Sequence, residues 1–454
     1  MSQAPLNGAV IIGRQNDGTR RALAVLGVLF GLTILAVVSV FAPLMLVIAG
    51  AIGAIWSAWR WPTAIVGLIF ALLPFLPLPT IAASGAHVAY VPLISSLKEM
   101  ALVICLASLW RRNGMAWKAA DGVGLVLLGM GLLSLLFRHD LQSLWGFKDD
   151  FAFLLPYFVG RTLNLSQARE VRWVRVSVVL MTVLALGGVV EAILGPGPRT
   201  LLYGLADPSE LPYSFTAFAY EGFRPGSFTS SPLEFGPFCA LGLVLLLAYR
   251  KELHRAWWLT SVPILVGLVI SLTRGAWLGL LLGAGIIAFR HGFKVKFALL
   301  SAVVMLVVLA LGPVFGMEDF LALTKSGRDL SFVYHQASLV ESAQSILAHP
   351  LGTGPGTVGP RASERQGKAS NVDGGYVTFG LEYSILAPFV LFLFYALCTA
   401  KCWRDYSQLG DFALTMIVTT AVLQVFMTLQ IDINLSAWML LPVGMSVREA
   451  SAQG

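Results

Sequence analysis

The sequence contains few charged residues. Lys, Arg, Asp and Glu make up 12% of its 454 residues, whereas they make up about 25% of an ordinary soluble domain. Apolar residues account for 57% of the chain, and the mean hydropathy is +0.78. A water-soluble fold of this length needs more charge to cover its surface, so the composition excludes a soluble enzyme. The same apolar content excludes an intrinsically disordered chain.

The chain also has few cysteines, and the usual catalytic signatures are missing. The four cysteines lie in or beside apolar runs without zinc-ligand spacing, so we interpret them as small apolar residues: Cys105, Cys239, Cys398 and Cys402. There is no H-E-x-x-H, no G-x-S-x-G and no P-loop, which disfavours metalloproteases, serine hydrolases and ATP-driven pumps. We therefore expect neither a metal nor a cofactor.

One glycine-rich string, Gly354-Pro-Gly-Thr-Val-Gly359, matches G-x-G-x-x-G literally. It lacks the preceding strand and the βαβ unit of a dinucleotide-binding fold, so we reject nucleotide binding. We expect these glycines to let the backbone pack tightly instead.

The net charge of +7 has a simple explanation in a membrane protein. Lys and Arg concentrate on cytoplasmic loops and set the topology, so we expect a lipid bilayer and no nucleic acid as partner. With both termini in the cytoplasm, most of the 31 Lys and Arg fall on the cytoplasmic side. Residues 1–21 have no early apolar core and no small-residue cleavage site, which disfavours a cleaved signal peptide.

Long apolar runs predict an all-α polytopic membrane protein with about 12 to 14 transmembrane helices, because one span needs about 20 apolar residues. The runs show no alternation with period two, which disfavours a barrel. The runs at 150–162 and 434–447 are short for a span, and we expect these to be tilted, partial or re-entrant. The runs cover about 22–40, 42–58, 62–79, 95–110, 121–137, 150–162, 174–194, 234–249, 256–272, 275–289, 296–315, 378–400, 411–429 and 434–447.

Two long loops on the extracytoplasmic side divide the chain. Connections of this length inside a helical bundle are usually functional. We found no internal repeat, which counts against inverted-repeat transporters. The predicted parts are N-terminal helices over 1–194, a loop over 195–233, central helices over 234–315, a large loop over 316–377, and C-terminal helices with a cytoplasmic tail over 378–454.

Three arginines on the extracytoplasmic side are candidates for binding an anion. They are Arg224, Arg274 and Arg328. The rigid guanidinium fork of arginine fits phosphate oxygens two at a time, so three near one face suit a pyrophosphate. Glu221 is a further candidate binding residue. The alternative is that each arginine reaches the interface or pairs with a carboxylate such as Glu221.

Three further residues are candidates for a general base. His335 and His349 are the histidines of the large loop, and their ordinary pKa suits proton transfer near neutral pH. Asp373 stands just before the run at 378, where a carboxylate is able to accept a hydroxyl proton. The alternatives are idle loop histidines and a carboxylate favoured by a helix dipole. Tyr376 completes the candidate binding residues, and Glu382 is a secondary candidate.

The order of these motifs resembles the O-antigen ligase and O-antigen polymerase superfamily of bacterial inner-membrane proteins. Arg224-Pro-Gly-Ser-Phe228 is followed by Ser271-Leu-Thr-Arg-Gly-Ala-Trp277 between two apolar runs. The large loop then contains Ser326-Gly-Arg328, His349-Pro-Leu-Gly-Thr-Gly-Pro-Gly356 and Asn371-Val-Asp-Gly-Gly-Tyr376. The resemblance covers about 220–400, and the first 200 residues match only in hydropathy.

The resemblance implies a fold like the GT-C glycosyltransferases, with both long loops and the active site in the periplasm. It implies metal-independent transfer from a glycan on undecaprenyl pyrophosphate to a glycan or lipid A-core acceptor, with polysaccharide-assembly proteins as further partners. Arg224 and Arg274 would correspond to the basic residues that hold the donor pyrophosphate, and a base in the large loop would deprotonate the acceptor hydroxyl.

One departure from the family pattern favours a polymerase over a ligase. The ligases typically carry a histidine just before the span that follows the large loop, whereas this chain has Asp373 there. The resemblance therefore favours a polysaccharide polymerase of O-antigen or exopolysaccharide synthesis. An O-antigen ligase or protein O-glycan ligase is the close alternative. A transporter or lipid flippase is the alternative of a different class, and it would place polar residues at mid-membrane depth.

Overall fold

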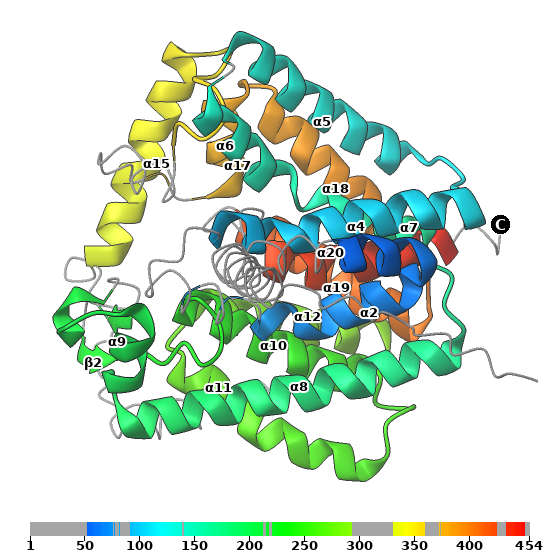
Figure 1. Cartoon of the computed structure of the whole chain (residues 1–454), viewed down its shortest axis with the longest axis vertical. Coiled ribbons are helices and arrows are strands. Elements are labelled where there is room, and N and C mark those ends of the chain that lie inside the picture. Colours follow the sequence, from blue (N-terminus) through cyan, green and yellow to red (C-terminus); the bar gives the residue numbers. More distant parts are fainter. Residues whose placement is uncertain are drawn as a thin grey trace, which may run out of the picture. The chain divides into compact units, whose positions relative to one another are not determined.

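The computed structural model describes residues 52–75, 77, 81, 91–138, 140–211, 215–217, 220–292, 330–358, 372, 374–424 and 433–449. The chain divides into two compact units, Met1–Trp56 and Ser57–Gly454. Only the last five residues of the first unit are described, so the architecture below is that of the second unit (Figure 1).

The second unit is built from helices, as the apolar runs predicted. Among the described residues, one antiparallel hairpin of two short strands interrupts them, with Thr216 opposite Phe223 and Ala217 opposite Tyr220. In chain order the elements are α2 Pro62–Leu72, η1 Leu73–Phe75, α4 Val91–Asn113, α5 Ala119–Phe137, α6 Leu141–Phe151, α7 Leu154–Thr162, α8 Gln167–Leu194, α9 Gly197–Tyr203, η2 Pro208–Glu210, β1 Thr216–Ala217, β2 Tyr220–Phe223, α10 Pro232–Ala248, η4 Arg255–Thr260, α11 Ser261–Ile270, α12 Arg274–Arg290, α15 Leu330–Ala348, α17 Gly375–Glu382, α18 Ala387–Arg404, α19 Gln408–Leu423 and α20 Ile433–Glu449.

Among the described residues, two helices are long and apolar enough to cross a bilayer. These are α5 and α8, and a third span results if the bent pair Ile52–Arg60 and Pro62–Phe75 counts as one. The helices α10 and α19 and the segment Ala256–Ile270 are apolar but shorter. The helical class is therefore confirmed, whereas the predicted number of spans and the predicted loop sides stay predictions.

The outward faces of the long helices are apolar. Phe137 at the end of α5 is 84% exposed, and Ile193 near the end of α8 is 78% exposed. Large apolar side chains exposed in this way are costly in water and favourable in hydrocarbon. Together with the apolar composition, these faces indicate an integral membrane protein.

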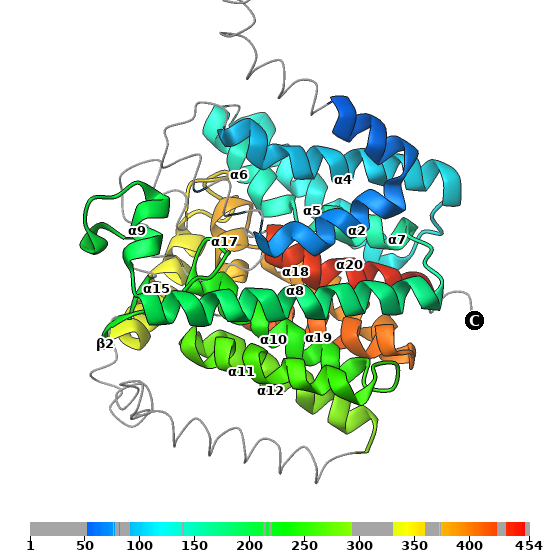
Figure 2. The same cartoon turned by 60° about the horizontal axis from the view of Figure 1, so that its bottom comes forward.

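Helix α10 lies at the centre of the unit and is buried along most of its length. Figure 2 shows α8 beside α10 and α11, and these helices are in contact. Helices α7 and α20 approach still more closely, because a Cβ atom on Gly160 would lie 2.2 Å from the carbonyl oxygen of Leu441. Small residues of this kind let helix backbones meet without a void.

One predicted run is broken in the structure. The run at 378–400 was expected to be a single span, but α17 ends at Glu382 and α18 begins at Ala387. Pro388 lies in the first turn of α18, where its missing amide hydrogen costs nothing, whereas inside a continuous helix it would break the hydrogen-bond ladder. The runs at 22–40 and 296–315 lie outside the described residues.

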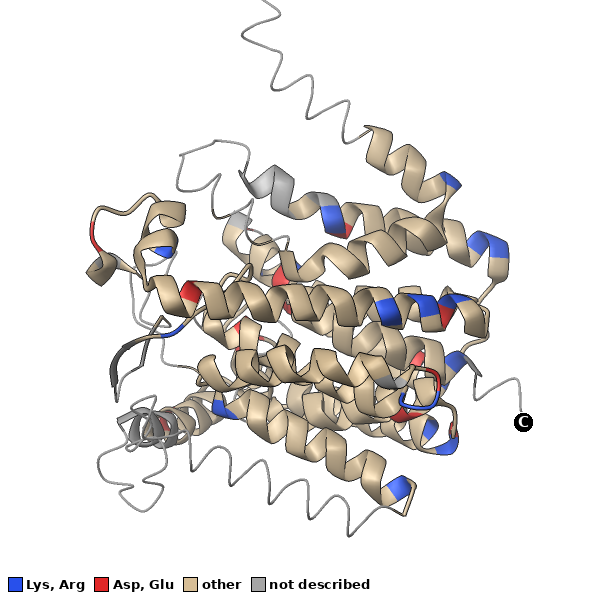
Figure 3. Cartoon of the chain, turned by 90° about the horizontal axis from the view of Figure 1, so that it is seen from below, with Lys and Arg blue, Asp and Glu red and all other residues tan. Residues whose placement is uncertain are grey.

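The helix bundle has two ends. We call the end with Arg290 and Arg448 the basic end, and the end with the β1–β2 hairpin the hairpin end. At the basic end, Arg448 of α20 donates to the carbonyl oxygens of Thr162 and Leu163 at the end of α7, and Arg290 of α12 donates to the Asp405 carbonyl after α18. At the hairpin end, Arg199 and Arg224 bind backbone of the loops that precede α10 and α12. Figure 3 shows most of the Lys and Arg at the basic end.

Candidate functional site

Arg224 lies at the hairpin end, on the turn that joins α11 to α12. Its Nε and Nη2 donate to the carbonyl oxygen of Ser271 at 3.1 and 3.0 Å. Nη2 also reaches the carbonyl oxygen of Leu272 at 3.3 Å and Oγ1 of Thr273 at 3.1 Å. Nη1 donates to none of the described residues. Arg224 therefore braces this turn through two of its three guanidinium nitrogens.

The turn that Arg224 braces has an unusual backbone. Leu272 has a φ of +51°, a left-handed conformation that branched and bulky residues rarely adopt. Thr273 ties the turn to the start of α10 by donating to the Pro232 carbonyl at 3.0 Å. Gly236 of α10 allows this approach, because a Cβ there would lie 2.6 Å from Oγ of Ser271.

Arg274 follows directly as the first residue of α12, and it is exposed. The N-cap residue Thr273 makes no side-chain cap bond to this helix, since its hydroxyl points to α10. Helix N-terminal amides and a guanidinium group at the same place favour an anion. The structure thus brings Arg224 and Arg274 together at this turn, and their binding of an anion stays a prediction.

The two guanidinium groups are close enough to affect each other. Burial, and to a smaller extent the Arg274 charge, lowers the pKa of Arg224 from its usual value to about 10. The group therefore stays charged at neutral pH. Two adjacent cations repel each other, and a phosphate bound between them removes that repulsion.

A buried ion pair beside this site was missed in the sequence. Arg199 of α9 donates to both carboxylate oxygens of Glu191 of α8, from Nε at 2.8 Å and from Nη2 at 3.0 Å. The sequence offered one signal for the pair, since Arg199 follows Glu191 by eight residues, after Gly195-Pro196-Gly197-Pro198.

Helix α15 separates the two candidate histidines. His335 and His349 are fourteen residues apart, which is about 21 Å along a helix axis. His349 lies just after the end of α15 and is exposed. The two histidines therefore do not serve one reacting group together.

The glycine-rich turn after His349 packs backbone against backbone, as predicted. A Cβ on Gly146 of α6 would lie 2.2 Å from the amide nitrogen of Gly356. Gln142 Nε2 donates to the Gly356 carbonyl at 2.8 Å, which fixes the turn to α6. The amide of Val358 donates to Oε1 of Glu382 at 3.0 Å, so this buried carboxylate holds the turn against α17.

The other predicted site residues fall into two groups. Tyr376 of α17 is half-buried, and its hydroxyl donates to the Ala421 carbonyl of α19 at 3.0 Å, so it holds two helices together. The backbone of Glu221 lies in β2, and its side chain is outside the described part. Arg328 and Asp373 lie outside the described residues.

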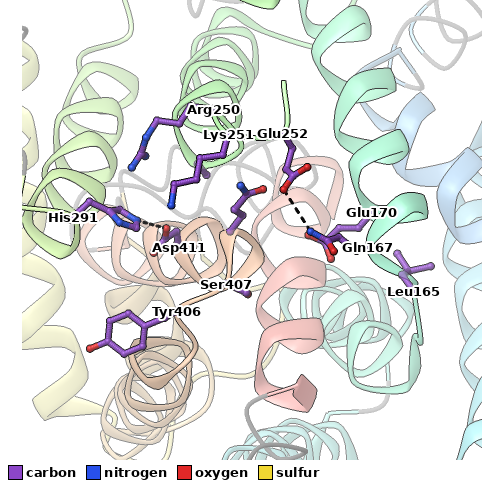
Figure 4. A pocket seen from close by; sticks show the side chains of 12 residues that line it. Leu165, Gln167, Glu170, Arg250, Lys251, Glu252, His291, Tyr406, Ser407 and Asp411 are labelled. Atoms are coloured by element: carbon purple, nitrogen blue, oxygen red, sulfur yellow. Dashed lines mark hydrogen bonds and ion pairs between the residues drawn. The ribbon is translucent and has the colours of Figure 1, made fainter. Parts of the chain in front are cut away.

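A polar cavity of about 430 Å³ lies at the opposite end of the bundle (Figure 4). Arg250, Lys251, His291 and Asp411 are among the residues that line it, and it includes none of the predicted site residues. Helix α12 begins at Arg274 and ends at Arg290, next to His291, so the cavity and the arginine site are about 25 Å apart. Within the described ranges, no three His, Cys, Asp or Glu gather as a metal site requires.

Comparison with known families matches one segment of the chain. The family model described as O-antigen ligase matches residues 259–377. The match confirms, for this segment, the resemblance inferred from the motifs, and it supports glycan transfer of the O-antigen ligase or polymerase type. The matched segment includes Arg274 but not Arg224. Arg224 belongs to the candidate site because it donates hydrogen bonds to the turn before Arg274. No curated protein matches the chain.

Proposed function

We propose that this protein is an inner-membrane polysaccharide polymerase. It transfers glycan from an undecaprenyl-pyrophosphate-linked donor to a glycan acceptor on the periplasmic face, in O-antigen or exopolysaccharide synthesis. The observation that supports this best is that Arg224 and Arg274 lie close together at the Ser271–Thr273 turn. This turn and Arg274 lie within the matched family segment.

Two arginines side by side suit the leaving group of this reaction. The acceptor hydroxyl oxygen bonds to the anomeric carbon of the donor while the bond from that carbon to the pyrophosphate oxygen breaks. The electron pair of the broken bond stays on the pyrophosphate, which gains negative charge. Cations fixed before the reaction stabilise that charge in the transition state more than in the bound donor.

The two arginines have different tasks in this proposal. Arg274 is exposed at the N-terminus of α12 and makes the main contact with phosphate. Arg224 binds the turn through Nε and Nη2, and it offers Nη1 and its positive charge to the phosphate. Arg224 therefore acts both as a brace for Arg274 and as a second cation.

The acceptor proton goes to a base in the large loop, and we assign it to Asp373. This residue directly precedes a segment that is firmly held, since the amide of Gly375 donates to the Gln424 carbonyl at 2.7 Å. His349 is the second candidate. The reaction needs no metal in this scheme, so transfer is expected to continue in the presence of a chelator.

A ligase is the second candidate function, because the matching family model is described as O-antigen ligase. The donor chemistry is the same, and the acceptor is then lipid A-core or a protein. Deleting the gene and separating the surface glycans by gel electrophoresis distinguishes the two. Loss of long chains with single units still attached supports a polymerase. Loss of all attached glycan, with lipid-linked chains accumulating, supports a ligase, and an unchanged glycan profile contradicts both.

A further inference from the structure

The segment that carries Arg224 is anchored by the buried pair Glu191–Arg199. Oε2 of Glu191 accepts hydrogen bonds from the amides of Gly226 at 3.0 Å and Ser227 at 2.5 Å. Arg199 donates to the carbonyl oxygens of Ser227 and Thr229, the latter at 3.0 Å. One ion pair therefore satisfies two amides and two carbonyls of a loop that has no regular structure.

The backbone that this pair holds is strained. Ser227 has a φ of +55°, and its hydroxyl donates to the Leu184 carbonyl of α8. Among the described residues, Ser227 and Leu272 are the only non-glycine residues with positive φ. One is held by Glu191 and Arg199, and the other is held by Arg224. Such conformations persist only where the surroundings impose them, and they concentrate at functional sites.

The anchor is close enough to Arg224 to set its position. Gly226 is two residues from Arg224, which is about 7 Å of extended chain at most. On its other side Arg224 is fixed by its own amide, which donates to the Phe215 carbonyl at 2.8 Å. The ring of Phe215 lies under the Arg199 guanidinium, with 5.1 Å between Cζ and the ring centroid. Arg199 thus contacts the supports on both sides of Arg224.

We infer that Glu191 and Arg199 are positioning residues for the pyrophosphate site, in that they set the place from which Arg224 reaches the turn of Arg274. The inference rests on the proposed function. The pair is too buried to bind the donor, since Arg199 is 2% exposed and Glu191 is 7% exposed. It acts through the loop that it holds.

The chain offers a matched control at the basic end. Arg161 donates to Asp121 from Nε at 2.9 Å and from Nη2 at 3.0 Å, and both residues are buried. This second pair has the same bidentate geometry, but it joins α5 to α7, far from the arginine site. A purely structural role predicts that equal damage to either pair has equal consequences for transfer.

The test compares Glu191→Gln with Asp121→Asn in the purified full-length protein. For each variant one measures the melting temperature, the shift in that temperature on adding undecaprenyl pyrophosphate, and the KM and kcat of glycan transfer. We expect similar losses of melting temperature in both variants. In Glu191→Gln we expect at least a tenfold loss of kcat/KM for the donor and a much smaller ligand shift, with the KM for the acceptor unchanged. Asp121→Asn keeps both the wild-type ligand shift and kcat/KM.

Equal kcat/KM and equal ligand shifts in the two variants overturn the inference while leaving the proposed function intact. A wild-type protein that shows neither transfer nor a ligand shift overturns the proposed function itself. If Glu191→Gln does not fold, the milder pair Arg199→Lys and Arg161→Lys is compared in the same way. Lysine keeps the charge but loses the fork, and the same difference between the two sites is expected.

Discussion

The two ends of the bundle contain the same buried motif and use it differently. At the basic end, Asp121 and Arg161 join two regular helices, and Tyr157 of α7 adds a hydrogen bond of 2.8 Å to the same carboxylate. At the hairpin end, Glu191 and Arg199 hold loop backbone that includes the strained Ser227. The Asp121–Arg161 pair stabilises the packing of two helices. The Glu191–Arg199 pair, as we infer, sets the position of Arg224 on the loop that it holds.

The largest expected effect is that of Arg274→Ala at the hairpin end. Removing one preorganised group that stabilises developing negative charge typically lowers kcat about 100- to 1000-fold. We expect polymer growth in cells to stop while the protein level stays unchanged, as measured by glycan gels and immunoblotting. Arg111→Ala is the control, since Arg111 is an exposed arginine of α4 at the basic end. Near-normal glycan length in Arg274→Ala contradicts the phosphate assignment.

Replacing the proposed base is expected to have the next largest effect. Asp373→Asn removes the proton acceptor, and general-base catalysis typically contributes about 100-fold or more. His349→Ala is expected to change the transfer rate little. Rates of the purified variants at saturating donor and acceptor decide between them, and the reverse order moves the base to His349.

Arg224→Ala tests whether a brace at the hairpin end matters for catalysis. It removes one cation and the hydrogen bonds to the Ser271–Thr273 turn, and we expect roughly a tenfold or greater loss of kcat/KM for the donor. Arg448→Ala is the matched control, because Arg448 also donates to backbone carbonyls, those of Thr162 and Leu163 at the basic end. Equal losses of kcat/KM in both variants would show that the loss comes from the missing hydrogen bonds to backbone carbonyls in general, and not from the missing cation at the phosphate site.

Gly146→Ala is expected to have the smallest effect on transfer and a clear effect on stability. The added methyl group meets the backbone of Gly356, which cannot move away as a side chain does. We expect a loss of about 2 kcal/mol, typical of overpacking, measured as a lower melting temperature. Gly122→Ala on α5 is the control, because nothing lies within 4 Å of a Cβ there. An unchanged melting temperature in Gly146→Ala contradicts the close approach of α6 to the glycine-rich turn.

Most of what the sequence predicted correctly depends on local pattern. Apolar runs predicted α5, α8, α10 and α12, because a buried or lipid-facing helix must be apolar along its length. The break between α17 and α18 was missed, although Pro388 marks it. A hydropathy average over 378–400 stays apolar whether or not it contains a proline. The helical backbone is interrupted there, because proline cannot continue the hydrogen-bond ladder.

The roles of the candidate site residues stay predictions. Arg224 and Arg274 were chosen because arginine is costly in an apolar region unless it has a task, and the structure places them together. Arg199 was missed because its partner and the loop that it holds are 8 to 30 residues away in the chain, and no periodicity connects them. Both histidines appeared equally suitable, since the sequence does not show that α15 keeps them apart.

The proposed function requires that the hairpin end of the bundle binds the pyrophosphate of a lipid-linked glycan through Arg274. The decisive experiment measures glycan transfer from an undecaprenyl-pyrophosphate donor by purified wild-type, Arg274→Ala and Arg111→Ala proteins. We predict that wild type and Arg111→Ala transfer at similar rates and that Arg274→Ala is at least 100-fold slower. Equal rates for Arg274→Ala and Arg111→Ala would contradict the claim.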